Sequence, residues 1–226
     1  SPLAFCVAFG VGYLIEWFLI SRLYHRPLDT LLATWGVSLI MQQCFRSFIG
    51  AREMSADFPE WLLGSWAASD IIDIPISGLV LLLLTICLTA GLAIYKSKTR
   101  MGLRMQATTQ NREMTGALGI NTKMTDRVTF GIACGISGIA GAFFTTMAST
   151  SPSAGTNYIV DSFLVLVVGG LGSLVGLFVS GGFRALLSSI LEFFMTGSIA
   201  KVWLYLIIFV VLMKFTRGLF SDKIRS

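Results

Sequence analysis

Residues Lys96–Arg127 read KSKTRMGLRMQATTQNREMTGALGINTKMTDR, a polar and basic stretch between two long apolar runs. The stretch has only two acids, Glu113 and Asp126, but it holds seven of the 17 Lys and Arg residues of the chain: Lys96, Lys98, Arg100, Arg104, Arg112, Lys123 and Arg127. Apolar runs of this length suit a lipid environment, whereas the polar stretch needs water. We therefore predict an aqueous loop between membrane helices, and the rest of the chain is arranged around it.

Inside this loop, Thr108–Leu118 has the composition of a short helix, with Met114, Ala117 and Leu118 at one-face spacing. Gly119 stands where a left-handed helix cap belongs, and the apolar Ile120 follows it. A helix of about 10 residues is marginal alone in water. We therefore expect a partner protein to order it.

The composition excludes a disordered chain and argues against a soluble domain. Hydrophobic residues make up 54%, charged residues only 13%, and the mean hydropathy is +0.77. Spanning a bilayer takes about 20 apolar residues in a helix. The sequence thus predicts an all-α, polytopic integral membrane protein with about six membrane helices. The net charge of +5 is no sign of nucleic-acid binding, because the bases cluster at the ends of apolar runs.

The expected spanning helices are Pro2–Ile20, Leu28–Gly50, Ile74–Tyr95, Val128–Ala148, Asp161–Gly182 and Lys201–Met213. Phe183–Met195 is too short to span. The chain begins inside an apolar run without an initiator Met, so we expect an upstream part to be missing. The single cysteines Cys6, Cys44, Cys87 and Cys134 are read as small buried hydrophobes.

Ala51–Asp73 is rich in acids and is the longest candidate outer loop, in which Trp61 and Trp66 predict a short helix at the headgroup level. One side of the membrane receives most of the Lys and Arg residues, namely those of the first turn, the central loop and the tail, together with Arg184. The other side receives only Arg46, Arg52 and Lys201. By the positive-inside rule, the central loop and the C-terminus are expected to be cytoplasmic.

Two sets of polar residues interrupt the apolar runs. Glu16 is interpreted as a helix-end ion pair with Arg22, with a proton or substrate site as the alternative. A polar stripe lies on the second expected helix and consists of Thr34, Ser38 and Gln42, extended by Gln43. Such a stripe either bonds a neighbouring helix or faces a watery path, and both readings stay open.

Small residues recur at helical spacing on two later helices. One set is Gly131, Gly135 and Gly138; the other is Gly169, Gly172 and Gly176, followed by Ser180. Both predict smooth faces on which another helix packs closely. The Gly169-Gly170 pair offers an alternative, because it could break its helix inside the membrane.

No pattern of a nucleotide, metal or nucleophilic site is found. The chain lacks a P-loop sequence, its one histidine, His25, has no metal-spaced partners, and no Ser, Cys or Thr has a base and an orienting acid in pattern. We therefore expect no enzyme and no cofactor. What remains is a gated path without its own energy source.

Several blocks resemble, in family order, the permease subunits of branched-chain amino-acid-type ABC importers. They are YHRPL at Tyr24–Leu28, LLATWGVSLI at Leu31–Ile40, GLR at Gly102–Arg104, NREM at Asn111–Met114, ALGIN at Ala117–Asn121, GGLGSLVG at Gly169–Gly176 and RGLF at Arg217–Phe220. The blocks LLATWG, TQNREM (Thr109–Met114) and YIVDSF (Tyr158–Phe163) look most like the urea and short-amide branch. The family tail has Pro where this chain has Thr216, and the family has further membrane helices before Ser1.

The resemblance implies a single permease domain over 1–226 in a bacterial-type inner membrane, with two ABC ATPase subunits, a second permease subunit and a periplasmic solute-binding protein as partners. It also implies that Arg112–Asn121 is the coupling helix seated on the ATPase, through Arg112, Glu113, Met114, Ala117, Leu118, Gly119 and Ile120. The alternatives are a stand-alone channel or secondary carrier, for which we find no inverted repeat, and an assembly subunit without a path. The substrate is not readable from these patterns.

Overall fold

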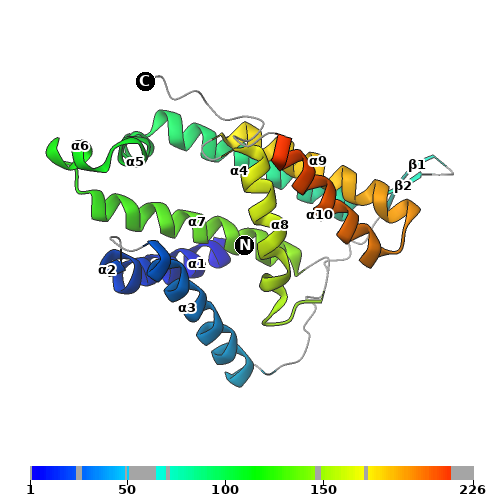
Figure 1. Ribbon diagram of the computed structural model, residues 1–226, viewed down its shortest axis with the longest axis horizontal. Helices are drawn as coiled ribbons and strands as arrows, with labels where there is room; N and C mark the ends of the chain where they lie inside the picture. Colours follow the sequence, from blue (N-terminus) through cyan, green and yellow to red (C-terminus); the bar gives the residue numbers. More distant parts are fainter. Residues whose placement is uncertain are drawn as a thin grey trace. The chain divides into compact units, whose positions relative to one another are not determined.

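The structure is a computed structural model that describes residues 2–23, 27–48, 50, 65–69, 72–145, 149–170 and 173–214. His25, Trp61, Gly172 and the tail with Thr216 lie outside the described residues. The chain divides into two compact units, Ser1–Pro152 and Ser153–Ser226, and each is described by itself (Figure 1).

In the first unit, the N-terminal helix packs along α7 (Thr122–Phe144). The N-terminal helix consists of α1 (Pro2–Ile15), the π-helical turn η1 (Glu16–Ile20) and α2 (Ser21–Leu23). Glycines allow the close approach: a Cβ on Gly131 would lie 2.9 Å from the Phe9 ring, and one on Gly138 2.9 Å from the backbone oxygen of Ala4. Gly135 faces Phe5 in the same way.

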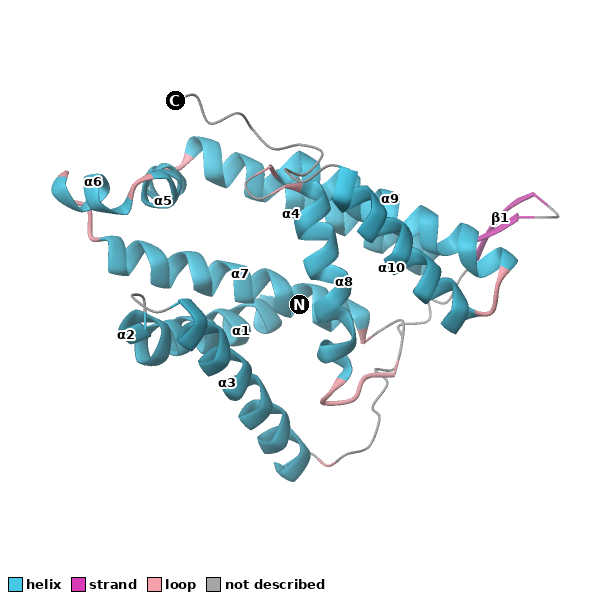
Figure 2. Ribbon diagram, viewed as in Figure 1, coloured by secondary structure: helices cyan, strands magenta, loops and turns pink. Residues whose placement is uncertain are grey.

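Helix α3 (Pro27–Phe48) follows, and its N-terminal end lies beside the π-helical turn and α2. Beyond it, β1 (Ser65–Ser69) pairs antiparallel with β2 (Ile72–Pro75), which leads into α4 (Ile76–Lys98). Figure 2 shows this two-stranded ribbon in magenta. The predicted interfacial helix is thus wrong at Trp66, which lies in β1 opposite Ile74 of β2, and β-branched residues such as Ile74 favour strands.

A tight corner joins α4 to α5 (Arg100–Gln110). The Thr99 side chain caps α5 by accepting a hydrogen bond from Gly102 N at 3.0 Å, and Gln106 Nε2 donates to Lys96 O at 2.8 Å. Gly102 is buried against the backbone of the corner. A Cβ on Gly102 would lie 2.7 Å from both Cα and O of Lys96.

We expect Gly102→Ala to destabilise this corner, because the atoms that the new methyl meets belong to the backbone and cannot move to another rotamer. Overpacking of this kind costs about 1–3 kcal/mol, more than the gain from replacing a helical glycine. The control is Gly91→Ala in α4, where nothing lies within 4 Å of a new Cβ. Thermal unfolding of the purified variants in detergent measures the difference. Equal midpoints for both variants would contradict the close contact.

The second unit contains α8 (Ala154–Gly169), α9 (Leu174–Phe194) and α10 (Gly197–Lys214). The predicted continuous helix Asp161–Gly182 is therefore wrong, and the alternative of a helix break at Gly169-Gly170 is confirmed. Helix α8 ends at Gly169, Gly170 has φ of +85°, and a new helix starts after Ser173, whose side chain caps Gly176 N. Phe183–Met195 is accordingly no separate short segment but belongs almost entirely to α9. The buried core of this unit is formed by Val168, Leu204 and Ile208.

The predicted helical membrane class is confirmed, with the ribbon as its one addition among the described residues. In that part of the chain, four helices are long and apolar enough to cross a membrane: Pro2–Leu23, Ile76–Lys98, Thr122–Phe144 and Leu174–Phe194. Helices Ala154–Gly169 and Gly197–Met213 are apolar but shorter. The expected burial of cysteines is wrong for Cys6, Cys44 and Cys87, which are exposed. Burying a small apolar side chain of a membrane helix against protein gains little free energy, because lipid is as apolar as the protein interior.

Candidate functional site

The central loop folds into two helices rather than one. Asn111 adopts an extended conformation (φ −152°, ψ 102°) between α5 and α6 (Arg112–Ala117), and its Oδ1 accepts a hydrogen bond from Met114 N at 3.0 Å. The predicted continuous helix Thr108–Leu118 is thus wrong, because it is interrupted at Asn111: its first three residues end α5, and α6 begins at Arg112. The physical reason is local, because an Asn side chain that caps a new helix competes with continuation of the old one.

The end of α6 is closed by a left-handed glycine. Gly119 has φ of +80°; its N–H donates to Gly116 O at 3.0 Å, and Ile120 N donates to Thr115 O at 3.3 Å. These two bonds are the Schellman arrangement, which satisfies carbonyls that would otherwise be left open at the helix end. Asn121 then caps α7 by accepting from Met124 N at 3.1 Å. Helix α6 is therefore short but closed at both ends.

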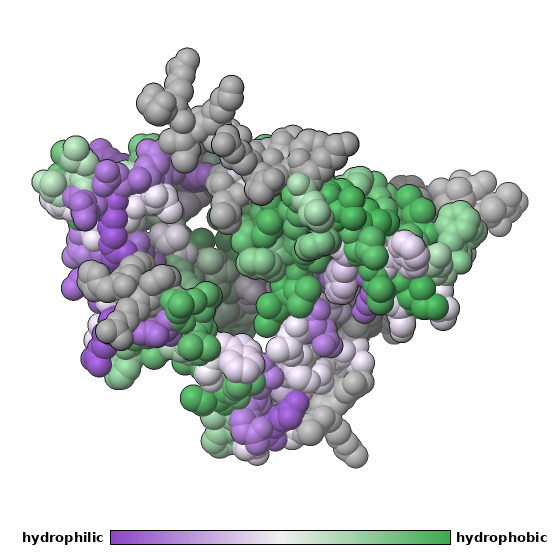
Figure 3. Space-filling view, viewed as in Figure 1, coloured by the Kyte–Doolittle hydropathy of each residue, from purple (hydrophilic) through white to green (hydrophobic). Residues whose placement is uncertain are grey.

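One side of α6 faces the rest of the first unit and the other is open. Thr115 is 3% exposed, and its Oγ1 donates to Asn111 O at 2.7 Å. By contrast, Met114 is 66% and Leu118 79% exposed, and Ala117 beside them is exposed too. Glu113 is exposed and Ile120 half-buried. Hydrophilic residues gather over α5, α6 and the start of α7 (Figure 3), so these apolar side chains stand out within a polar surface.

The first residue of α6 is tied to α7 by an ion pair. Arg112 Nη2 lies 2.9 Å from Asp126 Oδ2, and the Asp126 side chain is 16% exposed. The pair joins the short helix to the first turns of a long apolar one. Of the seven predicted coupling residues, Arg112 is thus anchored within the unit, while Met114, Ala117 and Leu118 point outward.

The polar stripe on α3 makes its hydrogen bonds within its own helix. Thr34 Oγ1 donates to Leu31 O at 2.9 Å, and Gln42 Nε2 donates to Ser38 Oγ at 3.3 Å. Thr34, Ser38 and Gln42 are half-buried, and Gln43 is exposed. The structure does not bring this stripe together with α6, so the two predicted sites are separate features of the first unit.

The predicted ion pair between Glu16 and Arg22 is wrong, because Glu16 pairs with Arg127. Its Oε2 lies 3.2 Å from Arg127 Nε on α7, and Glu16 is 1% exposed. Arg22 instead stands over the Phe18 ring, with its guanidinium carbon 5.8 Å from the centroid. Residues six apart lie on different faces of a helix, whereas those three or four apart are neighbours. Arg22 was therefore poorly placed to reach Glu16.

The second unit contains a polar cluster that sequence reasoning missed. Asp161 on α8 forms an ion pair with Arg184 on α9, and Tyr205 on α10 donates to Asp161 Oδ1 at 2.9 Å. Arg184 was counted above among the bases of the cytoplasmic side, but it lies in the middle of α9. A signal was present, because an acid and a base inside apolar runs are expected to pair.

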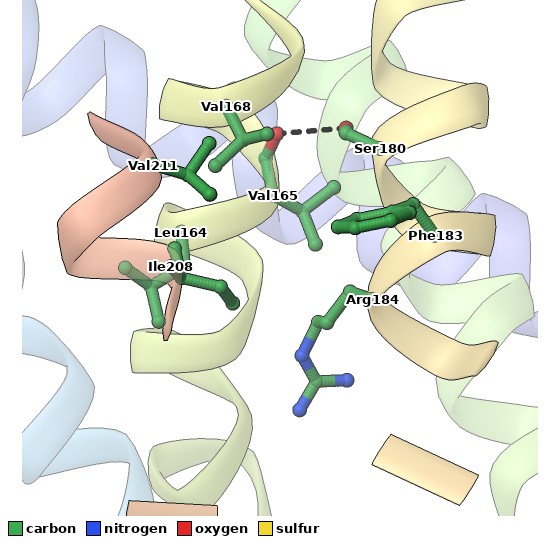
Figure 4. A pocket seen from close by; sticks show the side chains of 8 residues that line it. All are labelled: Leu164, Val165, Val168, Ser180, Phe183, Arg184, Ile208 and Val211. Carbon is green, nitrogen blue, oxygen red and sulfur yellow. Dashed lines mark hydrogen bonds between the residues drawn. The ribbon is translucent and has the colours of Figure 1, made fainter. Parts of the chain in front are cut away.

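Arg184 also borders an apolar pocket lined by residues of all three helices of this unit (Figure 4). Ser180 Oγ donates to Val165 O at 3.0 Å, and the Arg184 side chain extends away from this bond. Gly169 and Gly176 also lie close together: a Cβ on Gly169 would lie 2.9 Å from the backbone of Gly176. Gly169 and Gly176, predicted on one face of a single helix, therefore lie on two helices in contact.

The profile of one family, described as "Branched-chain amino acid transport system / permease component", matches residues 1–215. The high-affinity branched-chain amino acid transport system permease protein LivH of Escherichia coli (strain K12) is 23% identical over 227 residues, covering 96% of this chain and 71% of LivH.

Two further relatives are similar to shorter parts of the chain. LivH of Salmonella typhimurium is 26% identical over 189 residues, which are 79% of this chain and 59% of that protein. The corresponding permease protein BraD of Pseudomonas aeruginosa is 25% identical over 194 residues, with 80% and 62% covered. The chain therefore spans about three fifths of the length of these two relatives. No solved structure matches it.

Proposed function

Because the chain belongs to the branched-chain amino acid transport permease family, we propose that it is the membrane-spanning subunit of an ATP-driven ABC importer. In this proposal, residues 1–226 form one permease domain in a bacterial-type inner membrane. A second permease subunit, ABC ATPase subunits and a periplasmic solute-binding protein complete the machine. The chain forms part of the path and hydrolyses no ATP itself.

The observation that carries this proposal is the open apolar side of α6. Helix α6 has only six residues, and Met114 and the capping residue Leu118 are exposed within a polar surface. Such exposed apolar side chains indicate a contact with another protein. Insertion into a groove of another protein covers such a face. An ATPase seated there has a rigid element through which to move the membrane helices, so α6 and Gly119–Ile120 are the proposed coupling surface.

The substrate is proposed to be a small polar nitrogen compound, either urea or a short amide or a branched-chain amino acid. The relatives' names favour branched-chain amino acids, whereas the LLATWG, TQNREM and YIVDSF blocks look like the urea and short-amide branch. Thr34, Ser38, Gln42 and Gln43 are the proposed path residues, since hydroxyl and amide groups offer both donors and acceptors to such solutes.

The test is purification of the tagged chain with its ATPase, permease and binding-protein partners, followed by uptake of labelled urea and labelled leucine into proteoliposomes. We expect ATP-dependent uptake of one of the two. Uptake without ATP, or a chain that never holds an ATPase, would instead support a stand-alone channel or carrier.

The proposed orientation gives a direct labelling prediction. Ser97 lies near the C-terminal end of α4, beside Lys96 and Lys98, whereas Ser69 lies in the ribbon that precedes its N-terminal end. In a cysteine-free background on intact cells, Ser69→Cys should react with an impermeant thiol reagent and Ser97→Cys should not, because bases stay on the cytoplasmic side. The reverse labelling pattern would overturn the orientation.

A further inference from the structure

The buried carboxylate of Glu16 is the least expected group in the first unit. It lies within an apolar helix of 22 residues that is long enough to cross a membrane. Glu16 is 1% exposed and opens a five-residue π-helical turn. Its Oε2 contacts Arg127, while its Oε1 is buried without a hydrogen-bond partner in the described part of the chain. Both the burial and the π-turn are costly, and π-turns occur frequently at functional sites.

Glu16 is part of a chain of charges that reaches the proposed coupling surface. Arg127 follows Asp126, and Asp126 pairs with Arg112, the first residue of α6. Two acids and two bases thus alternate from the π-turn of the first membrane helix, through α7, to the start of α6.

The contacts around these charges restrict the movement of α6 relative to α7. Only Leu118–Asn121 separate α6 from α7, Asn121 caps α7, and Thr125 next to the charges is 2% exposed. A displacement of α6 therefore moves Arg112 against Asp126, and α7 carries Arg127 along. At the far end, the π-turn is one residue wider than an α-turn, so it can take up a small shift by a local change of hydrogen bonding.

We infer that Glu16 and Arg127, together with Asp126, are positioning residues for coupling: they transmit a displacement of α6 to the π-turn of the first membrane helix. This inference rests on the proposed function, in which α6 docks on an ATPase. A purely structural ion pair would stabilise the helix packing and leave the response to substrate unchanged. The positioning role predicts that the response is lost while the complex remains assembled.

The experiment uses the complete transporter with its ATPase, partner permease and binding protein in proteoliposomes. The variants are Glu16→Gln and Asp126→Asn, which keep the side-chain shape and remove the charge, and their combination. Arg22→Gln is the matched control, because Arg22 lies on the same helix but stands over the Phe18 ring instead of pairing with Glu16. The readouts are ATPase co-purification, basal ATP hydrolysis, and stimulation by substrate-loaded binding protein.

We expect Glu16→Gln and Asp126→Asn to retain the ATPase and the basal rate, and each to lower the stimulation about fivefold or more, the usual scale of coupling between two sites. The double variant should lose little more than either single one, because residues in one network are not additive. Arg22→Gln should respond like the unaltered protein.

The results separate this inference from the function on which it rests. An unaltered complex that holds no ATPase contradicts the proposed function. Normal stimulation in Glu16→Gln, or additive losses in the double variant, overturns the inference alone. If Glu16→Gln does not fold, Asp126→Asn decides, because its pair is partly exposed; loss of stimulation then supports the coupling role and normal stimulation refutes it.

Discussion

Replacement of Ala117 by glutamate is expected to abolish substrate-stimulated ATP hydrolysis without removing the chain from the membrane. Ala117 lies beside Met114 and Leu118 on the open side of α6, and none of the three belongs to a helix of membrane length. If an ATPase covers this face, the new carboxylate is buried without a partner. An uncompensated buried charge costs about 3 kcal/mol or more, enough to displace the ATPase at ordinary concentrations.

A second variant of the same surface acts through the backbone. Gly119 has φ of +80°, a conformation that β-branched residues strongly resist, so Gly119→Val should open the cap and misdirect α6. It leaves the apolar side chains of the face unchanged. The two variants therefore disturb the same contact, one by charge and the other by geometry.

The measurement is a pull-down of the ATPase and its stimulated activity in the complete complex. The control is Lys98→Gln, an exposed residue at the end of α4, which should keep both. Should Ala117→Glu retain a stoichiometric and stimulated ATPase, α6 is not the coupling helix. The importer proposal would then stand on family membership alone.

The largest effect on folding is expected at Gly176, where α8 and α9 approach each other. Gly176 is buried, and its backbone lies 2.9 Å from the position of a Cβ on Gly169. Because Gly176 is buried beside this contact, the four side-chain carbons of Gly176→Leu find room only if neighbouring elements move apart. We expect a loss of about 3 kcal/mol or more, at the upper end for overpacked cores.

Val175→Leu is the matched control, since Val175 is the preceding residue of α9 and is 69% exposed. Folded yield and unfolding temperature in detergent should fall sharply for Gly176→Leu and stay unchanged for Val175→Leu. If both variants fold equally well, the two helices do not pack through their glycines. That outcome would refute the close approach in the second unit.

The sequence by itself determined the features that depend on residues close together along the chain. The bilayer sets the length of an apolar helix, so the helical membrane fold follows from apolar runs such as Ile76–Lys98. The left-handed end of α6 is likewise local, because a glycine followed by an apolar residue is the pattern of that cap. The start of α6 is local too, because the side chain of Asn111 caps the new helix and competes with continuation of the preceding one.

Only the tertiary structure decided which distant groups meet. Glu16 finds Arg127 rather than Arg22, and Asp161 finds Arg184 and Tyr205 on two other helices. The structure likewise decided between the two interpretations of the Gly169-Gly170 pair: the helix breaks there, and Gly169 and Gly176 lie on two helices in contact. A charged side chain in an apolar helix is costly unless it is paired, so the sequence predicts that each such charge has a partner but does not identify the partner. The choice of partner depends on which helices pack side by side and at what register, and packing is a property of the folded chain.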